Sequence, residues 1–159
     1  MRIGIGYDVH QLQKGESLVL GGVHIPAEKG LAGHSDADVL THALMDALLG
    51  AMGKGDIGLH FPDTDEKYKG ISSLVLLEEI KKYLLENDYI VENIDMIIMA
   101  EKPRLAPYIQ EMKDNIAGVL DISSDRINIK ATTTEKLGFV GREEGMAAEV
   151  VVLLNKEKN

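Results

Sequence analysis

The sequence contains no cysteine and no tryptophan, and the missing cysteine excludes both a disulfide framework and a thiolate nucleophile. No stretch approaches the roughly 20 apolar residues that a membrane-spanning helix needs. Basic residues are scarce relative to acidic ones, 17 against 26, and the net charge is −9. This balance argues against general binding to the phosphate backbone of nucleic acids. It is still compatible with a small anionic substrate, because a bound metal ion can reverse the local field.

The sequence does contain enough apolar material for one core. Of its 159 residues, 45% are hydrophobic and only 4% are aromatic, so we expect an aliphatic core and a single domain covering residues 1–159. The first predicted strand begins at Arg2, which leaves no room for a signal or transit peptide before it. We therefore expect a soluble, cytoplasmic protein that binds neither a membrane nor nucleic acid.

The pattern of apolar residues predicts strands and helices that alternate in the second half of the chain. Strands are expected at residues 2–11, 95–100, 127–134 and 147–154, and a hairpin at 17–25 that turns at Gly21-Gly22. Helices are expected at 36–52, with Ser35 as N-cap, at 72–87, and from Pro107 to about residue 120. Together these elements predict an α/β (α+β) fold, with helices packed on one face of a four- to five-stranded sheet.

Two further features bear on function before any motif is considered. Gly4 and Gly6 lie inside the first predicted strand, where glycine often marks the close approach of another backbone or of a ligand. The segment 53–70 has no regular apolar pattern, and a long irregular stretch in a compact domain is usually functional or mobile.

The clearest candidates for chemistry are Asp8 and His10, two residues apart in the first predicted strand. Such side chains point to the same face, and a third ligand would complete a tetrahedral zinc site with one open position. His42, in the predicted helix, strengthens this interpretation, and Asp38 or Asp46, four residues away on either side, is expected to orient its ring. The alternatives are a solvated polar strand face and an ordinary surface histidine. The pattern favours an enzyme over a binding module.

Other motifs are weaker when taken singly. His34 and Ser35 precede a predicted helix, whose N-terminus attracts anions, although Ser35 can simply cap the helix. Residues 131–135 place three hydroxyls and a carboxylate at the end of a strand, which suits a phosphate with a hard cation such as Mg²⁺, but threonine is also an ordinary strand residue. The glycine-rich segment 53–58 lacks the dinucleotide and P-loop patterns, and the acidic run 61–65 is typical of a turn.

In this order and spacing, the motifs resemble the 2-C-methyl-D-erythritol 2,4-cyclodiphosphate synthase family over essentially the whole chain. The residues that carry the resemblance are Gly-Tyr-Asp-Val-His at 6–10, His-Ser-Asp-Ala-Asp-Val at 34–39, Asp-Ile-Gly at 56–58, Phe-Pro-Asp-Thr-Asp at 61–65, Thr-Thr-Thr-Glu at 132–135 and Gly-Phe-Val-Gly-Arg-Glu-Glu-Gly at 138–145. The resemblance implies a homotrimer of subunits with a mixed sheet and outer helices, and active sites between subunits. The implied reaction cyclises 4-diphosphocytidyl-2-C-methyl-D-erythritol 2-phosphate to the 2,4-cyclodiphosphate and releases CMP, in non-mevalonate isoprenoid biosynthesis.

The resemblance also implies residue roles. Asp8, His10 and His42 are the implied zinc ligands, and Glu135 is the implied ligand of a second divalent cation, Mg²⁺ or Mn²⁺. His34 and Thr133 are the implied catalytic residues that stabilise the transition state. The implied substrate-binding residues are Asp8, Val9, His10, His34, Ser35, Asp56, Ile57, Gly58, Phe61, Pro62, Asp63, Thr64, Asp65, Ala100, Glu101, Lys102, Pro103, Arg104, Leu105, Ala106, Ala131, Thr132, Thr133, Thr134, Glu135, Phe139 and Arg142.

One departure and two alternatives remain. Arg104 stands where lysine is frequent in the family; the positive charge is kept, but as a planar fork. Phe139 and Arg142 are implied to lie near the trimer axis, beside a cavity for an isoprenoid diphosphate. The same residues also fit a metal-dependent phosphohydrolase that yields linear products, or a non-catalytic protein that binds isoprenoid phosphates.

Overall fold

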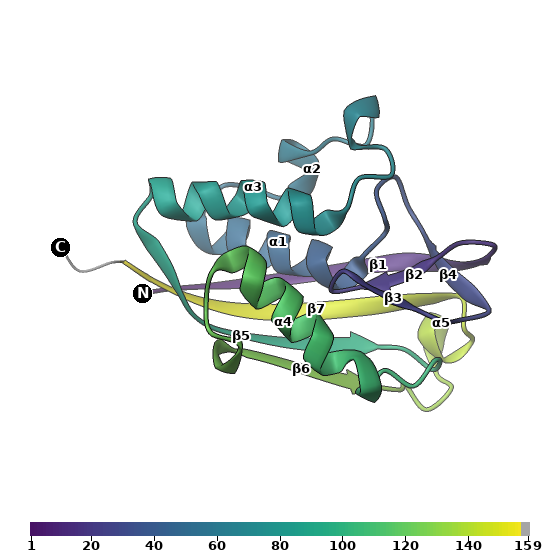
Figure 1. Ribbon diagram of the computed structural model, residues 1–159. Coiled ribbons are helices and arrows are strands. Elements are labelled where there is room, and N and C mark those ends of the chain that lie inside the picture. The colour runs from purple at the N-terminus through teal and green to yellow at the C-terminus, as the bar shows by residue number, and fades with distance from the viewer. Residues whose placement is uncertain (157–159) are drawn as a thin grey trace.

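A five-stranded mixed sheet is the base of the computed structural model, which describes residues 1–156 (Figure 1). The strands are β1 (Arg2–Lys14), β4 (Lys29–Ala32), β5 (Tyr89–Met99), β6 (Ile127–Thr132) and β7 (Gly145–Lys156). They lie in the order β4-β1-β7-β5-β6; β5 and β6 are parallel and every other neighbouring pair is antiparallel. The predicted hairpin is confirmed as β2 (Leu18–Leu20) and β3 (Val23–Ile25), which pair with each other on either side of Gly21-Gly22.

Three long helices cover one face of this sheet, as predicted (Figure 1). They are α1 (Val39–Met52), α3 (Ser73–Glu86) and α4 (Ile109–Leu120), and α4 follows a 3-10 turn, η2 (Ala106–Tyr108), that contains Pro107. The shorter helical segments are α2 (Ile57–His60), η1 (Glu66–Tyr68), η3 (Ser124–Arg126) and α5 (Gly138–Gly141). Within residues 1–156, none of the helices is long and apolar enough to cross a bilayer.

Several predicted boundaries were wrong. β4 was not predicted, β5 starts six residues earlier than expected, β6 ends at Thr132, and the irregular segment 53–70 contains α2 and η1. The first helix begins at Val39 because Ala37 has a φ of 55°, a left-handed conformation that cannot continue into an α-helix. Ser35 is therefore not the N-cap. That role belongs to Asp38, whose side chain accepts a hydrogen bond from the backbone N–H of Thr41.

The two glycines of β1 let α1 lie directly on the strand. A Cβ added to Gly4 would lie 1.9 Å from Ala47 O, and one added to Gly6 would lie 1.9 Å from Ala43 O. The expected close approach is thus confirmed, and its partner is the backbone of α1. Because His42 is in the turn of α1 that packs on Gly6, this contact brings His42 beside the strand that carries Asp8 and His10.

The opposite face of the sheet is uncovered by any helix of the described chain. Along β1 the alternate residues Ile3, Ile5, Tyr7 and Val9 are 70%, 64%, 54% and 39% exposed. Monomeric proteins rarely expose so continuous an apolar strip. We call this strip the outer apolar face.

Candidate functional site

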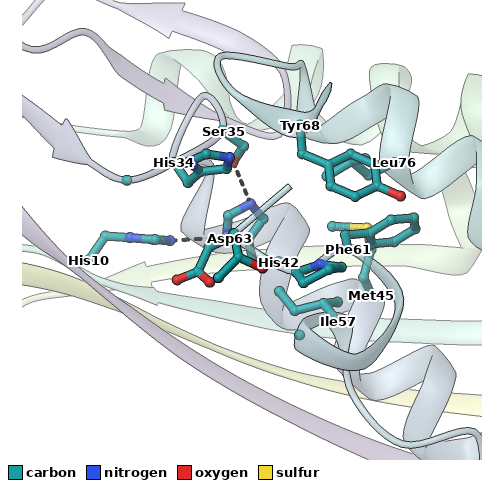
Figure 2. Close-up of a pocket in the computed structure, with 14 residues that line it drawn as sticks. His10, His34, Ser35, His42, Met45, Ile57, Phe61, Asp63, Tyr68 and Leu76 are labelled. Atoms are coloured by element: carbon teal, nitrogen blue, oxygen red, sulfur yellow. Dashed lines mark hydrogen bonds between the residues drawn. The ribbon is translucent and has the colours of Figure 1, made fainter. Parts of the chain in front are cut away.

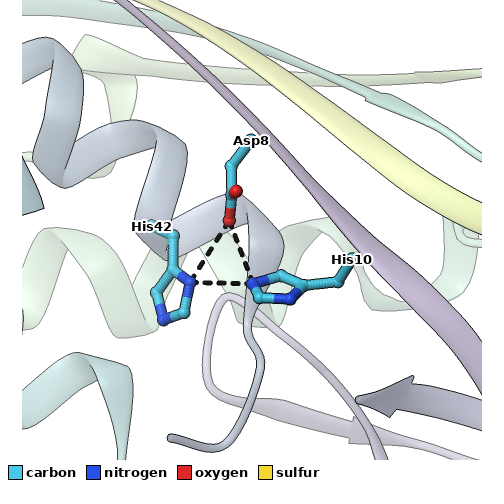
Figure 3. A group of neighbouring side chains, drawn as sticks. All are labelled: Asp8, His10 and His42. Carbon is cyan, nitrogen blue, oxygen red and sulfur yellow. Dashed lines mark hydrogen bonds and ion pairs between the residues drawn. The ribbon is translucent and has the colours of Figure 1, made fainter. Parts of the chain in front are cut away.

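Asp8, His10 and His42 converge on a common point (Figure 3). Asp8 Oδ2 lies 3.0 Å from His10 Nε2 and 3.2 Å from His42 Nδ1, and the two ring nitrogens are 3.0 Å apart. Ligand atoms of a tetrahedral zinc ion, bonded at about 2.0–2.1 Å, are roughly 3.3 Å from one another. One carboxylate and two imidazoles at this spacing fit a divalent cation such as zinc.

Contacts within the cluster shift the pKa of Asp8 and the pKa of His10 in opposite directions. Burial opposes ionisation of Asp8, but its side-chain contacts with His10 and His42 outweigh this effect and hold the pKa of the carboxyl below its ordinary range. Burial likewise opposes a charge on His10, yet the contact with Asp8 raises the pKa of the His10 ring. His10 Nδ1 lies 3.1 Å from Ala32 O, which can only accept, so this nitrogen carries a hydrogen and Nε2 is the one aimed at Asp8.

The two carboxylates expected to orient His42 do not contact it, so that prediction was wrong. Asp38 is fully buried and accepts hydrogen bonds from the backbone N–H and the hydroxyl of Thr41, at 3.0 and 2.8 Å. Asp46 Oδ1 accepts a hydrogen bond from the backbone N–H of Ile57 at 2.8 Å. Both carboxylates instead hold backbone segments in place, Asp38 at the start of α1 and Asp46 at the start of α2.

The outer nitrogen of His42 meets two hydroxyls from other segments. His42 Nε2 lies 2.9 Å from Ser73 Oγ and 3.0 Å from Ser35 Oγ. Ser73 is the first residue of α3 and contacts the carboxylate of Asp36 through both its hydroxyl and its backbone N–H. The orienting groups therefore come from a neighbouring helix and from the loop before α1, and the i, i+4 spacing in the sequence could not identify them.

A cavity of about 520 Å³ opens beside the cluster (Figure 2). Its walls are His10, Gly33, His34, Ser35, His42, Met45, Ile57, Gly58, Phe61, Pro62, Asp63, Thr64, Tyr68 and Leu76. In Figure 2 the histidines, Ser35 and Asp63 lie on one side and Phe61, Tyr68, Met45 and Leu76 on the other. One wall is therefore polar and next to the metal cluster, and the other is apolar.

Nine of the predicted substrate-binding residues line this cavity together with the predicted metal ligand His42, and the sequence missed Gly33, Met45, Tyr68 and Leu76. Their helical spacing marks Met45 and Leu76 only as core residues. Four other residues predicted within the segments 8–65 are not in the wall: Asp8 belongs to the metal cluster, Val9 lies on the outer apolar face, Asp56 caps α2 and Asp65 caps η1. His34 Nε2 donates to Asp65 O at 3.3 Å, which ties His34 to this rim.

A second cavity, of about 460 Å³, lies where β5 and β6 end. It is lined by Ala100, Glu101, Lys102, Pro103, Arg104, Leu105, Ala106, Ala131, Thr132 and Thr133. The predicted segment 100–106 and its partners at 131–133 are thus together. The two cavities share no lining residue.

Glu101 organises the loop beside this second cavity. Its Oε1 accepts hydrogen bonds from the backbone N–H of Thr134 at 3.0 Å and of Lys136 at 3.2 Å. Glu135 and Lys136 both have a positive φ, 53° and 64°, so the loop needs such an anchor. In this loop Thr133 Oγ1 donates to Glu135 Oε1 at 3.1 Å, which brings the predicted catalytic hydroxyl and the predicted metal carboxylate together.

The remaining predicted residues lie elsewhere. Phe139 and Arg142 are in and just after α5 and line neither cavity; the guanidinium of Arg142 makes two hydrogen bonds of 3.0 Å to Glu144. Of the other histidines, His24 is exposed and His60 Nε2 donates to Lys54 O at 2.8 Å. Only two of the five histidines therefore reach the metal cluster.

Comparisons with known proteins agree with this architecture. The model of the YgbB family matches residues 1–155. A protein of Halothermothrix orenii named 2-C-methyl-D-erythritol 2,4-cyclodiphosphate synthase is 65% identical over 154 residues, which are 97% of this chain and 93% of that protein. The structure of the bifunctional IspDF of Campylobacter jejuni superposes with a TM-score of 0.95 at 48% identity, covering 99% of this chain and 42% of that one. IspF of Plasmodium falciparum in a CDP complex has a TM-score of 0.87 at 31% identity, with 99% and 97% covered.

Three observations together define the class of this protein. They are the candidate metal cluster beside a cavity, the mixed α+β fold, and the match to known proteins along almost the full chain. The chain belongs to the YgbB family, the family of the 2-C-methyl-D-erythritol 2,4-cyclodiphosphate synthases. It is an enzyme, a lyase that forms a cyclic diphosphate. The resemblance seen in the sequence is confirmed.

Proposed function

We propose that this enzyme converts 4-diphosphocytidyl-2-C-methyl-D-erythritol 2-phosphate to 2-C-methyl-D-erythritol 2,4-cyclodiphosphate and CMP, in non-mevalonate isoprenoid biosynthesis, with zinc held by Asp8, His10 and His42. The observation that carries the proposal is the convergence of these three side chains within 3.0–3.2 Å of one another beside a cavity. When bound, zinc would supply a positive charge that neutralises and polarises a phosphate oxygen.

The substrate brings its own nucleophile, an oxygen of the 2-phosphate. A bond forms between this oxygen and the β-phosphorus, and the bond from the β-phosphorus to the oxygen bridging to the α-phosphate breaks, so that its electron pair leaves with CMP. A phosphate oxygen is already anionic at neutral pH, so the enzyme needs no strong general base. The protein has to hold the two phosphates in line and to stabilise the negative charge that they share.

Two groups are proposed as hydrogen-bond donors to that charge. His34 lies in the wall of the first cavity, and Thr133 lies in the wall of the second. A hydrogen-bond donor directed at the charge that develops in the transition state contributes a large part of the rate enhancement when water is excluded from the site. Glu135, in contact with Thr133, fits the ligand of Mg²⁺ or Mn²⁺, since Mg²⁺ usually takes one or two carboxylates together with substrate phosphates.

A homotrimer with active sites between subunits is proposed as the working assembly. Within one chain the metal cluster and the Thr133–Glu135 loop serve different cavities, and a substrate that needs both is accommodated where two chains meet. The outer apolar face supports this arrangement, because Ile3, Ile5 and Tyr7 are each more than half exposed in the single chain. Phe139 and Arg142 are proposed to lie near the axis of this trimer, where an isoprenoid diphosphate would bind.

The test is to incubate the purified chain with the diphosphocytidyl substrate, Zn²⁺ and Mg²⁺ and to follow the products by ³¹P NMR. We expect stoichiometric CMP and a cyclic diphosphate. A linear diphosphate would instead favour a phosphohydrolase, and unchanged substrate would favour a binding protein. His42→Ala is the matched variant: we expect it to lose zinc and nearly all activity while the trimer still forms. Normal zinc content in that variant would contradict the assigned ligand set.

A further inference from the structure

Ser73 and Asp36 form a buried pair behind the proposed zinc ligand His42. Ser73 is completely buried at the start of α3, and His42 is 8% exposed. Asp36 Oδ2 accepts the backbone N–H of Ser73 at 2.9 Å, and Asp36 Oδ1 accepts the Ser73 hydroxyl in a short hydrogen bond. Ser73 Oγ in turn lies 2.9 Å from His42 Nε2. The three groups form one chain that ends on the metal cluster.

Counting hydrogens along this chain gives each bond a direction. A serine hydroxyl has one hydrogen, and an ionised carboxylate can only accept. Ser73 therefore donates its hydroxyl hydrogen to Asp36, and Ser73 Oγ accepts a hydrogen bond from the N–H of His42 Nε2. A neutral imidazole with its hydrogen on Nε2 has its free electron pair on Nδ1. Nδ1 is the nitrogen that faces Asp8 Oδ2 at 3.2 Å.

We propose that Ser73 and Asp36 are positioning residues that hold His42 in the one neutral tautomer able to bind zinc. The inference rests on the zinc site proposed above and adds two residues to it. Metal-bound histidines commonly donate their second ring nitrogen to a partner that sets tautomer and orientation, and loss of such a partner typically costs about 10–100-fold in metal affinity. Here the partner is a hydroxyl whose own direction is set by a carboxylate.

Backbone contacts keep this pair in register with α1. Asp36 donates its backbone N–H to Ile71 O at 3.0 Å, and Gly70 donates its N–H to His34 O at 2.8 Å. These bonds pair the loop before α1 with the segment that leads into α3. Asp36 thus also provides the side-chain cap of α3 from outside that helix, since Ser72, the N-cap residue by position, makes no side-chain cap bond.

The second hydroxyl near His42 plays a lesser part. Ser35 Oγ lies 3.0 Å from His42 Nε2 and accepts the backbone N–H of Ala37 at 3.3 Å. It can share the His42 hydrogen, but no carboxylate directs its own hydrogen. Ser35 can therefore accept from His42 Nε2 or donate to it, and the choice of tautomer falls to Ser73.

Two substitutions test whether the hydrogen bonds of Ser73 and Asp36, and not only their packing, determine zinc affinity. Ser73→Ala removes the acceptor while Ser35 remains, so we expect zinc affinity to fall by about tenfold, the lower end of the usual range. Asp36→Asn keeps the size and shape of the side chain but reverses the direction of the hydrogen bonds that link residue 36, Ser73 and His42. Because the Ser73 N–H needs the amide oxygen, the amide nitrogen must face Ser73 Oγ. The hydroxyl then donates to His42 Nε2, which favours a hydrogen on Nδ1 and blocks the metal, so we expect the larger loss, near 100-fold.

The experiment measures the tautomer and the zinc affinity of the whole protein side by side. Ring-nitrogen NMR of ¹⁵N-histidine-labelled, metal-free protein reports which nitrogen of His42 carries hydrogen, and chelator competition reports affinity for Zn²⁺ alone. Ser72→Ala, next to Ser73 but exposed, is the matched control and should change neither. We expect the Nε2–H form in the wild type and in Ser72→Ala, and a shift toward Nδ1–H in Asp36→Asn.

The two proposals fail in different ways. A wild-type protein that binds no zinc would overturn the zinc site, and with it the role assigned here. Tight zinc binding by the wild type together with unchanged affinity and tautomer in Ser73→Ala and Asp36→Asn would overturn only the positioning role. An Nδ1–H tautomer in the metal-free wild type would also overturn that role, and this measurement does not depend on any variant folding.

Discussion

Replacing Gly6 with alanine tests directly how the fold assembles Asp8, His10 and His42. The new Cβ would lie 1.9 Å from Ala43 O, whereas ordinary van der Waals contacts begin at 3.4 Å. The helix and the strand must therefore separate by about 1.5 Å at this point if neither gives elsewhere. Metal ligands have to sit within about 0.2 Å of their bonding distances. A shift of this size would take His42 out of bonding range of an ion held by the strand.

The expected result has two parts. Overpacking of a dense interior costs about 1–3 kcal/mol, and for a chain of this length each kcal/mol lowers the unfolding midpoint by roughly 2–4 °C. We therefore expect thermal unfolding of the metal-free variant about 2–12 °C below the wild type. Zinc affinity, measured by chelator competition, should fall by more than the roughly 100-fold that loss of an outer hydrogen-bond partner can cost.

Two control variants sharpen this prediction. Gly4→Ala creates the same 1.9 Å overlap, but with Ala47 O, so it should destabilise similarly and weaken zinc binding less. Gly118→Ala lies on the exposed side of α4 with no atom near its Cβ, and alanine there should stabilise the helix by about 0.5–1 kcal/mol. If Gly6→Ala unfolds at the wild-type temperature and binds zinc normally, the close contact of α1 with β1 does not build the site.

Three further predictions follow from named contacts. Zinc affinity should fall about tenfold per pH unit below the raised pKa of His10, because one proton must then be displaced, and should level off above it; chelator competition across pH checks this, and a flat profile would contradict it. Glu101→Ala should lower the turnover rate with zinc content unchanged, because the backbone N–H groups of Thr134 and Lys136 lose their acceptor. An unaltered rate would contradict the role of Glu101 in anchoring this loop. Ile5→Glu should turn the proposed trimer into folded monomers in sedimentation experiments, since this residue is 64% exposed in the single chain; an intact trimer would place the interface elsewhere.

Local features of the fold were predictable because they depend on periodicity within one element. The period of two in β1 puts Asp8 and His10 on one face, and the Gly21-Gly22 turn defines its hairpin. Less periodic pieces were not predictable. β4 has four residues and forms because it pairs with β1. The start of β5 was missed because a bulge between Val91 and Asn93 interrupts the alternation of side chains along the strand. The start of α1 was misplaced because Ser35 and Asp38 are both good caps, and only the backbone at Ala37 decides between them.

The sequence by itself determined the donor atoms of the site and, through the resemblance, the family. The sequence could not determine which atoms from other helices, strands and loops would contact these donor atoms. The tertiary structure decided that His42 reaches Asp8, because two glycines allow α1 to lie against β1. It also decided that Ser73, 31 residues from His42, and neither Asp38 nor Asp46, faces the ring. Contacts between elements depend on how volumes and hydrogen bonds are satisfied across the whole core, and no spacing within a single helix or strand contains that information.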